Sequence, residues 1–377
     1  MKKEINIYFD NNATTFISSR ALSTMIETLQ SVQGNPSSIT RDGRFAKNLL
    51  MKAKKELALV LKCNFEELTF TSGGTESIHT LIHGICSHRK GKILTTKIEH
   101  KSVLESIKKL NGEIVYIPVD EKGAPLPSLI SEVLADGSIS AIILSLVNGE
   151  TGAMLDLKEI AELASKHNIP LILDGVAALG RAPIELMRGI TAIAFSGHKC
   201  HGPKGTGFFY LKDKTPFHPL FKGGMQESGF RAGTENLPGI LALVEAVKEI
   251  HESSQTYMLE LRNAFENKIK DLFREATING GTNRVCNVSN VHFKDIDGDH
   301  LLIYLDQHHI TASLGSACSS GTLEASHVLI GMGFSNEYAR SSIRFSFSKM
   351  NTLKEIDQVC EILQQYKKNT FLSFLKI

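Results

Sequence analysis

The sequence predicts an α/β protein with a mainly parallel sheet in a large domain and a smaller α+β domain. Through the middle of the chain, short apolar runs alternate with segments of helical periodicity. Helices of this length between successive strands favour parallel pairing, with helices on both faces of the sheet. The chain has 377 residues, which exceeds the usual size of a single core, so we expect two domains.

The strands expected in the large domain are short, apolar and followed by polar residues. They cover residues 68–71, 92–96, 141–147, 170–173 and 190–195. Helices are expected at 101–110 and 157–167 because apolar residues there recur at helical spacing. Ligands of such sheets bind at the carboxyl ends of the strands, so the polar residues at these ends are candidates for a site.

The smaller domain is expected to follow a long helical bridge. Helical periodicity runs from 237 to 276, with a weak break at 252–254. The elements expected beyond it are a strand at 290–293, a helix at 298–308, a strand at 342–347 and a helix at 353–367. The large domain is therefore expected to cover residues 15–255, and the smaller one to combine residues 1–14 with 256–377.

Composition and charge narrow the classes of function. Apolar residues make up 42% of the chain and charged residues 22%, and the formal net charge is +2, so neither nucleic acid nor a membrane is an expected partner. No secretory signal is visible, and no run approaches the roughly 18 apolar residues of a spanning helix. The six cysteines form no CxxC pair, which favours free thiols in a cytoplasmic protein. A metal site is not expected, because His198, Cys200 and His201 lie on one turn without a second ligand pair.

The most informative motif is Ser-Gly-His-Lys at 196–199, directly after the strand at 190–195. A hydroxyl, an imidazole and a lysine on a turn suit an anionic aldehyde cofactor. The serine and histidine can hold a phosphate, and the lysine can form a Schiff base. The residues alone do not separate Lys199 from Lys204 for that role, and a surface turn with two ordinary lysines is the alternative.

Polar residues at other strand ends fit the same interpretation. Gly74 and Thr75 open a helix, where backbone N–H groups and a hydroxyl form either an anion site or a simple capped turn. Asp174 follows a buried strand and suits a protonated pyridine nitrogen, although a helix cap is equally common. His100 can stack on a flat ring or move protons, and Asn148 can donate to a ring oxygen or a substrate carboxylate. Each can instead be structural.

Two motifs of the smaller domain complete the set. Alternation over residues 343–347 places Arg344 on the face opposite three apolar residues. A guanidinium fixed on a strand suits bidentate binding of a carboxylate, and an exposed surface arginine is the alternative. Cys318 lies among small residues at 315–321, a composition that suits an accessible thiol on a loop tip.

Together these motifs resemble the cysteine desulfurases, pyridoxal-phosphate enzymes of the class V aminotransferase group with fold type I. The resemblance runs from Tyr-Phe-Asp-Asn-Asn-Ala-Thr-Thr at 8–15 to Arg-Phe-Ser at 344–346, and it includes Arg-Ala-Gly-Thr at 231–234. It implies conversion of L-cysteine to L-alanine, with the sulfur left on an enzyme cysteine as a persulfide. It also implies a homodimer. The stretch 311–329 is similar to that of the long-loop group of the family, which delivers sulfur to acceptors such as iron–sulfur scaffold proteins. The resemblance leaves open whether the sulfur is used for iron–sulfur clusters, for tRNA thiolation or for both.

The resemblance also assigns roles to individual residues. It implies that Lys199 carries pyridoxal 5′-phosphate and that Cys318 takes the sulfur. It places His100 over the ring, and Asn148 and Arg344 near the substrate carboxylate. The residues implied for the rest of the cofactor are Gly74, Thr75, Ser196 and His198 at the phosphate, Thr234 from the other subunit, and Asp174 at the pyridine nitrogen.

Three positions depart from the family's usual pattern. Ala177 stands where members usually carry a glutamine that contacts the ring oxygen, and Gly149 and His79 each stand where an asparagine is common. Loss of a ring-oxygen donor costs about 1–3 kcal/mol if its partner stays dry and unpaired, which predicts an altered cofactor absorbance or a slower enzyme. The alternatives are a selenocysteine lyase or another class V enzyme and, from a different class, a non-catalytic sulfur-binding or partner protein.

Overall fold

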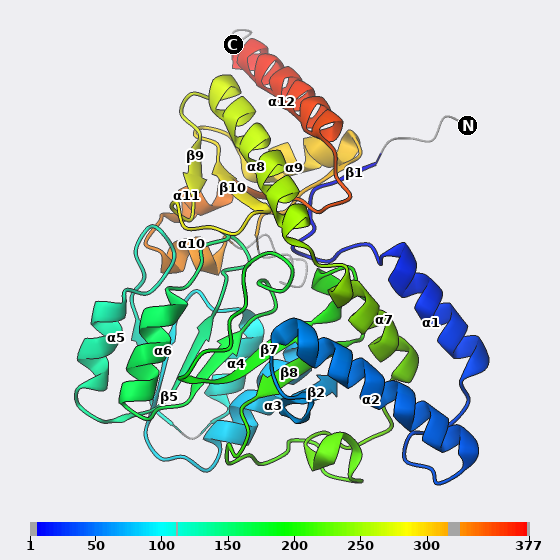
Figure 1. The fold of residues 1–377 in the computed structure, drawn as a ribbon. Coiled ribbons are helices and arrows are strands. Elements are labelled where there is room, and N and C mark those ends of the chain that lie inside the picture. The colour runs from blue at the N-terminus through cyan, green and yellow to red at the C-terminus, as the bar shows by residue number, and fades with distance from the viewer. Residues whose placement is uncertain (1–5, 111, 316–324, 375–377) are drawn as a thin grey trace.

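The computed structural model centres on a seven-stranded sheet with the order β2-β8-β7-β6-β5-β3-β4 (Figure 1). It describes residues 6–110, 112–315 and 325–374, and side chains as far as residue 369. The strands are β2 (Leu68–Thr71), β3 (Lys92–Thr96), β4 (Ile114–Ile117), β5 (Ile139–Ser145), β6 (Leu171–Asp174), β7 (Ile190–Ser196) and β8 (Gly207–Leu211). β8 runs antiparallel to both its neighbours, and the other pairs are parallel. The expected mainly parallel sheet is confirmed.

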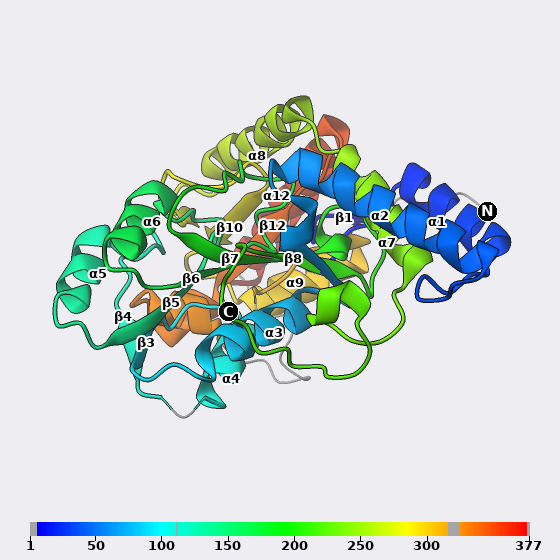
Figure 2. The same ribbon diagram turned by 60° about the horizontal axis from the view of Figure 1, so that its bottom comes forward.

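Helices cover both faces of this sheet, as Figure 2 shows. One face packs against α3 (Gly74–Cys86) and α4 (Lys101–Lys108). The other packs against α2 (Arg41–Leu61), α5 (Pro127–Leu134), α6 (Leu157–Lys166) and α7 (Leu237–Lys248), while α1 (Ser19–Ser31) lies against α7. Successive residues of a strand pack on opposite faces of the sheet. Ile143 of β5 packs in the core with α3 and α4, and Leu144 packs in the core on the α2 side. Because both faces are buried, the strands appear in the sequence as continuous apolar runs.

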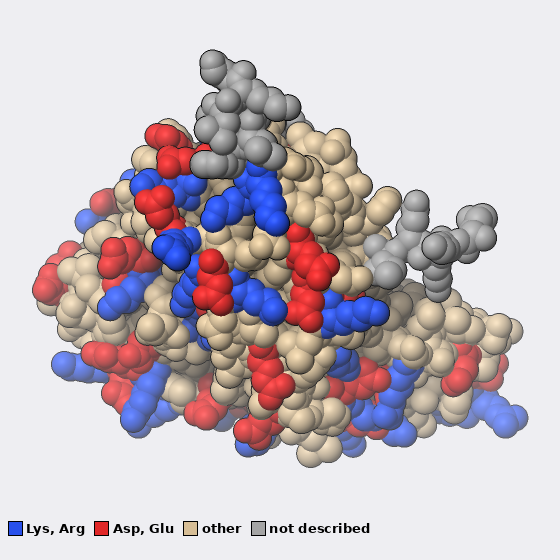
Figure 3. Space-filling view, turned by 90° about the horizontal axis from the view of Figure 1, so that it is seen from above, with Lys and Arg blue, Asp and Glu red and all other residues tan. Residues whose placement is uncertain are grey.

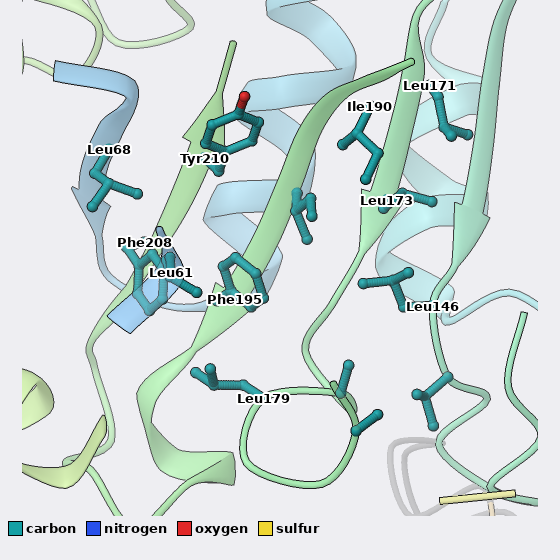
Figure 4. Packing of buried hydrophobic residues seen from close by; sticks show 14 of the residues in the cluster. Leu61, Leu68, Leu146, Leu171, Leu173, Leu179, Ile190, Phe195, Phe208 and Tyr210 are labelled. Carbon is teal, nitrogen blue, oxygen red and sulfur yellow. The ribbon is translucent and has the colours of Figure 1, made fainter. Parts of the chain in front are cut away.

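The core on the α2 side combines aliphatic and aromatic side chains from the strands with side chains from the helices that cover them (Figure 4). Leu173 of β6, Phe195 of β7 and Phe208 of β8 are each at most 1% exposed. The Phe195 and Phe208 rings stack with centroids 4.7 Å apart. This packing fixes the strands whose carboxyl ends carry the polar residues.

A smaller unit lies at the top of Figure 1 and joins the two ends of the described chain. Its strands are β1 (Ile7–Tyr8), parallel to β11 (Ile310–Thr311), and the antiparallel set β9 (Thr277–Asn279), β10 (Val288–His292) and β12 (Ser342–Ser346). Its helices are α8 (Glu252–Leu272), α9 (Gly298–Gln307), α10 (His327–Gly331), α11 (Asn336–Arg340) and α12 (Leu353–Phe374). Phe9, Phe265, Phe345 and Phe347 are fully buried in its core. The boundary at residue 255 stays a prediction.

Several element ends differ from those expected. β5 starts and stops two residues before the predicted 141–147, and the helical bridge is two helices, α7 and α8, that break at residues 249–251. Short 3-10 helices lie at Phe65–Glu67, Gly197–Lys199 and Gln226–Gly229. Side-chain caps set several helix starts: Thr40 accepts from Gly43 N, and Asp297 accepts from His300 N. In the described part of the chain, no helix has the length and apolar character needed to cross a membrane.

Candidate active site

A pocket of about 390 Å³ lies where the parallel strands of the central sheet end, a volume within the range of about 300–1,000 Å³ that is typical of small-molecule sites. Ser196 and Asp174 are the last residues of β7 and β6, and the turns after β5 and β3 supply further wall. The expected site residues that line the pocket are Gly74, Thr75, His100, Asn148, Asp174, Ser196, His198, Lys199 and Arg344. Thr234 is exposed and does not line the pocket of its own chain, and Cys318 lies outside the described residues.

The turn after β7 aims one lysine into the pocket. Gly197–Lys199 forms a single 3-10 turn directly after the strand. The Lys199 Nζ donates to the backbone oxygens of Asn12 (2.5 Å) and Ala13 (2.8 Å). Lys204, the other candidate, is exposed and does not line the pocket. The geometry thus separates two lysines that the sequence left equivalent.

The N-terminus of α3 offers a donor set that fits a phosphate. The first N–H groups of a helix have no partner within it, so they attract anions. The Ser196 hydroxyl is buried and has no hydrogen-bond partner among the described residues. A Cβ built on Gly73 would lie 4.0 Å from that oxygen, so the hydroxyl sits beside the helix start. Because buried polar atoms normally have partners, this orphaned hydroxyl fits an oxygen-rich ligand such as the phosphate of pyridoxal phosphate.

His198 is held in its neutral form at this end of the pocket. Burial, together with the nearby Lys199 and Arg181, lowers the pKa of His198 to about 4. Its Nδ1 lies 3.1 Å from the Thr14 hydroxyl. At neutral pH the ring is therefore uncharged, and it can contribute one N–H donor to a phosphate but no positive charge.

Asp174, at the end of β6, and His100, after the end of β3, both line the pocket, and β5 lies between their strands. Burial raises the pKa of Asp174, whereas the nearby His100 and Lys199 lower it. A cation placed against this carboxylate, such as a protonated pyridine, removes the cost of burying its charge. The His100 Nδ1 accepts a hydrogen bond from Ser102 N (3.1 Å) and caps α4. The neutral ring therefore carries its proton on Nε2.

Asn148 lines the pocket, and its amide also makes hydrogen bonds within the surrounding turns. Its Oδ1 accepts from the N–H groups of Glu150 (2.9 Å) and Thr151 (3.0 Å). Its Nδ2 donates to the Ile98 carbonyl (3.2 Å). These bonds show that Asn148 shapes the turn, and its role toward a ring oxygen or a substrate carboxylate stays a prediction.

Arg344 is buried in the pocket wall, so the alternative of an exposed surface arginine is wrong. Only 5% of the residue is exposed. Its Nη2 donates to Asp10 Oδ1 (2.7 Å), its Nη1 donates to the Gly149 carbonyl (3.1 Å), and its buried Nε has no partner among the described residues. A guanidinium with one unused buried donor suits an incoming carboxylate.

Sequence reasoning missed several residues of this wall. Asn12 and Ala13 line the pocket, and Asp10 pairs with the lining Arg344. All three belong to the N-terminal run, whose only signal was its place in the resemblance. Glu150 and His327 also line the pocket, and neither follows a strand directly. Among the described residues, no group of three or more His, Cys, Asp or Glu side chains could hold a metal ion.

Comparisons with known proteins agree with this geometry. A family model described as aminotransferase class-V matches residues 7–359. The chain is 38% identical over 373 residues to the cysteine desulfurase IscS of Methanosarcina thermophila, an alignment that covers 95% of this chain and 91% of the relative. Among solved structures, it is similar to a NifS-like protein, with a TM-score of 0.88, 32% identity and coverage of 98% and 100% of the two chains. It is also similar to SspA in complex with cysteine, with a TM-score of 0.81, 28% identity and coverage of 92% and 100%.

Proposed function

The chain belongs to the class V aminotransferase family, and we propose that it is a cysteine desulfurase that uses pyridoxal 5′-phosphate to convert L-cysteine to L-alanine. The observation that carries this proposal is the assembly of Lys199, Asp174 and Arg344 around one pocket beside a phosphate-type donor set. When bound, the cofactor supplies a covalent attachment point for the amino acid and a ring that withdraws electrons from its Cα. The retained lysine, aspartate and arginine also argue against a non-catalytic partner protein.

The residues that hold the cofactor are proposed from their donor and acceptor chemistry. Ser196, Thr75, His198 and the N–H groups of α3 bind the phosphate, with Gly74 leaving room at the helix start. A Cβ on Gly74 would lie only 2.7 Å from a Val176 methyl carbon, so glycine is required there. Asp174 pairs with the pyridine nitrogen, and His100 lies against the ring.

Lys199 and Arg344 act on the amino acid. The carbonyls of Asn12 and Ala13 hold the Lys199 ammonium by hydrogen bonds, which fixes the direction of its Nζ. In its neutral form this nitrogen accepts the Cα proton of the substrate and later returns a proton. The unused Nε of Arg344 binds the substrate carboxylate and thereby fixes the orientation of the side-chain sulfur.

Cys318 is proposed as the sulfur acceptor, as the sequence resemblance implies. Its thiolate attacks the substrate sulfur, so an S–S bond forms on the enzyme while the C–S bond of the substrate breaks. The carbon that loses sulfur gains a proton, and L-alanine leaves. L-cysteine and one enzyme thiol thus give L-alanine and one enzyme persulfide, which requires no external oxidant.

Assembly as a homodimer is supported by an exposed apolar face on α1. Leu22, Ile26 and Leu29 recur at helical spacing on one side of this helix and are 44%, 45% and 61% exposed. Exposed apolar faces of this kind mark protein interfaces. Thr234 is exposed outside its own pocket, which leaves it available to a partner subunit.

The sulfur acceptor is proposed to be a protein, such as an iron–sulfur scaffold, in the cytoplasm. The described cysteines carry free thiols, a state that reducing compartments maintain. On the face shown in Figure 3, Lys and Arg are interspersed with Asp and Glu rather than gathered in one basic patch. This mixed charge on that face agrees with a net charge of +2 and with the proposal of a protein as the acceptor.

The proposal is tested by incubating the cofactor-loaded protein with L-cysteine and measuring alanine, with Cys318→Ala and Lys199→Ala alongside. Alanine that depends on both residues supports the desulfurase. A cofactor-loaded protein that forms no alanine, or a Cys318→Ala variant with full activity, would overturn it. The same rates measured with L-selenocysteine in place of L-cysteine would show which of the two amino acids is the preferred substrate.

A further inference from the structure

Glu150 is a buried carboxylate in the pocket wall that the reaction above does not use. It is 7% exposed and lies in the turn after β5, which Asn148 fixes through the hydrogen bonds described above. A buried carboxylate is costly unless it is hydrogen-bonded. The contacts of Glu150 therefore indicate why the chain keeps it there.

The Glu150 carboxylate contacts both sides of the stretch that contains Cys318. Residues 316–324 lie outside the described part, between Gly315 and Ser326. The Ser326 Oγ donates to Glu150 Oε2 (2.5 Å) and accepts from Leu329 N (3.1 Å), which caps α10. On the other side, a Cβ built on Gly315 would lie 2.4 Å from Glu150 Oε2. The carboxylate thus occupies the space beside Gly315 and holds Ser326 at the same point.

Arg344 is tied to the same turn. Its Nη1 donates to the carbonyl of Gly149, the residue before Glu150, at 3.1 Å. The same nitrogen lies 3.5 Å from the Gly315 carbonyl. Arg344, which is proposed to bind the substrate carboxylate, and Glu150 therefore both lie against Gly315, and Glu150 adds the hydrogen bond from Ser326 on the other side of the stretch.

We propose that Glu150 is a positioning residue, which holds Gly315 and Ser326 in register with Arg344 and so aligns the Cys318 thiol with the substrate sulfur. This role rests on the proposed desulfurase function. Burial raises the pKa of Glu150, while Ser326, His327 and Arg344 lower it. A carboxyl oxygen accepts from Ser326 in either protonation state, so the role requires an acceptor and not a charge.

The test separates sulfur transfer from substrate binding in the cofactor-loaded full chain. Rapid mixing with L-cysteine follows the cofactor absorbance, and quenched samples give the Cys318 persulfide by mass spectrometry. In Glu150→Ala, we expect persulfide formation to slow about 10- to 100-fold, because a misplacement of about 1 Å costs up to about 100-fold. The absorbance change and its dependence on L-cysteine concentration should stay within about twofold of those of the unchanged protein.

Conservative and control variants distinguish positioning from general damage. Glu150→Gln keeps the acceptor for Ser326, so its persulfide rate should recover to within about threefold of the original. Ser326→Ala should slow the same step, and Glu150→Ala/Ser326→Ala should be little worse than the slower single variant because the two residues act as one unit. Glu162→Ala, an exposed glutamate on α6, is the matched control and should change nothing.

The outcomes distinguish this role from the proposed function itself. A normal persulfide rate in Glu150→Ala, or an equal loss in absorbance change and persulfide formation, overturns the positioning role alone. The role is also overturned if Glu150→Gln is as slow as Glu150→Ala. If the unchanged protein forms alanine without any Cys318 persulfide, both the sulfur-transfer step and the positioning role fail.

Discussion

Removal of the Asp10 carboxylate should destabilise the protein strongly, because it leaves the Arg344 guanidinium buried without its ion-pair partner. The two residues are 8% and 5% exposed, and Asp10 Oδ1 lies 2.7 Å from Arg344 Nη2. At an effective dielectric constant of about 20, unit charges at that separation attract by about 6 kcal/mol. Breaking a buried pair by removing one partner costs about 3–5 kcal/mol. We expect a loss of that size in the free energy of unfolding of Asp10→Ala.

Denaturation in urea, followed by circular dichroism because the chain contains no tryptophan, measures this loss as a lower midpoint. The control is a double-mutant cycle with Arg344→Met, which removes the stranded charge and fills similar volume. The double variant should be less destabilised than the sum of the single variants by about 1–3 kcal/mol, a typical coupling for contacting residues. Strict additivity, or a loss below about 1 kcal/mol in Asp10→Ala, would refute the role of the pair in the pocket wall.

Three further predictions concern the cofactor site and the pH dependence of the protein's stability. Ser196→Ala removes a hydroxyl that has no partner among the described residues, so the cofactor-free protein should keep its stability. Its affinity for pyridoxal phosphate, measured by absorbance titration, should fall about 10- to 100-fold, because a charged hydrogen bond contributes about 1.5–3 kcal/mol. An unchanged affinity would show that Ser196 does not bind the phosphate. Ala177 lines the pocket, so Ala177→Gln should supply a hydrogen-bond donor there and shift the cofactor absorbance or raise turnover. A variant identical to the original protein in both measurements would show that the position has no effect. Burial lowers the pKa of His201 to about 4, so between about pH 6.5 and 4 the unfolded chain binds more protons than the folded one, and stability should fall as the pH decreases through that window. The urea midpoint of His201→Gln should fall less over the same window. Equal falls in the two proteins would contradict the lowered pKa of His201.

Local sequence patterns predicted the part of the site that lies at strand ends. Asp174 and Ser196 each come at the end of an apolar run, and parallel strands bring such positions to one edge; the pattern alone left Lys199 and Lys204 equivalent. The glycine and small hydroxyl residues of 73–75 likewise predicted the helix start that the structure shows, with an anion site or a simple capped turn as the two interpretations. These predictions needed only the period of the strands and the chemistry of the residues after them.

The remaining parts of the site depend on contacts between distant residues. Nothing near Arg344 in the sequence reveals that Asp10 pairs with it, because β12 and the N-terminal run meet only in the folded smaller unit. Asn148 offers a second case, since its hydrogen bonds with residues 150 and 151 appear only when the turn is built. Glu150 carried no signal at all, because its partner Ser326 lies far away in the chain.

The central claim is tested most directly by a single-turnover measurement of alanine and Cys318 persulfide in the same sample, with L-cysteine, cofactor-loaded protein and no acceptor. The account predicts one persulfide on Cys318 for each alanine formed, both products being absent from Lys199→Ala, since the desulfuration that supplies the sulfur depends on this lysine. Alanine formed without a matching persulfide on Cys318, or in equal amount by Lys199→Ala, would contradict it.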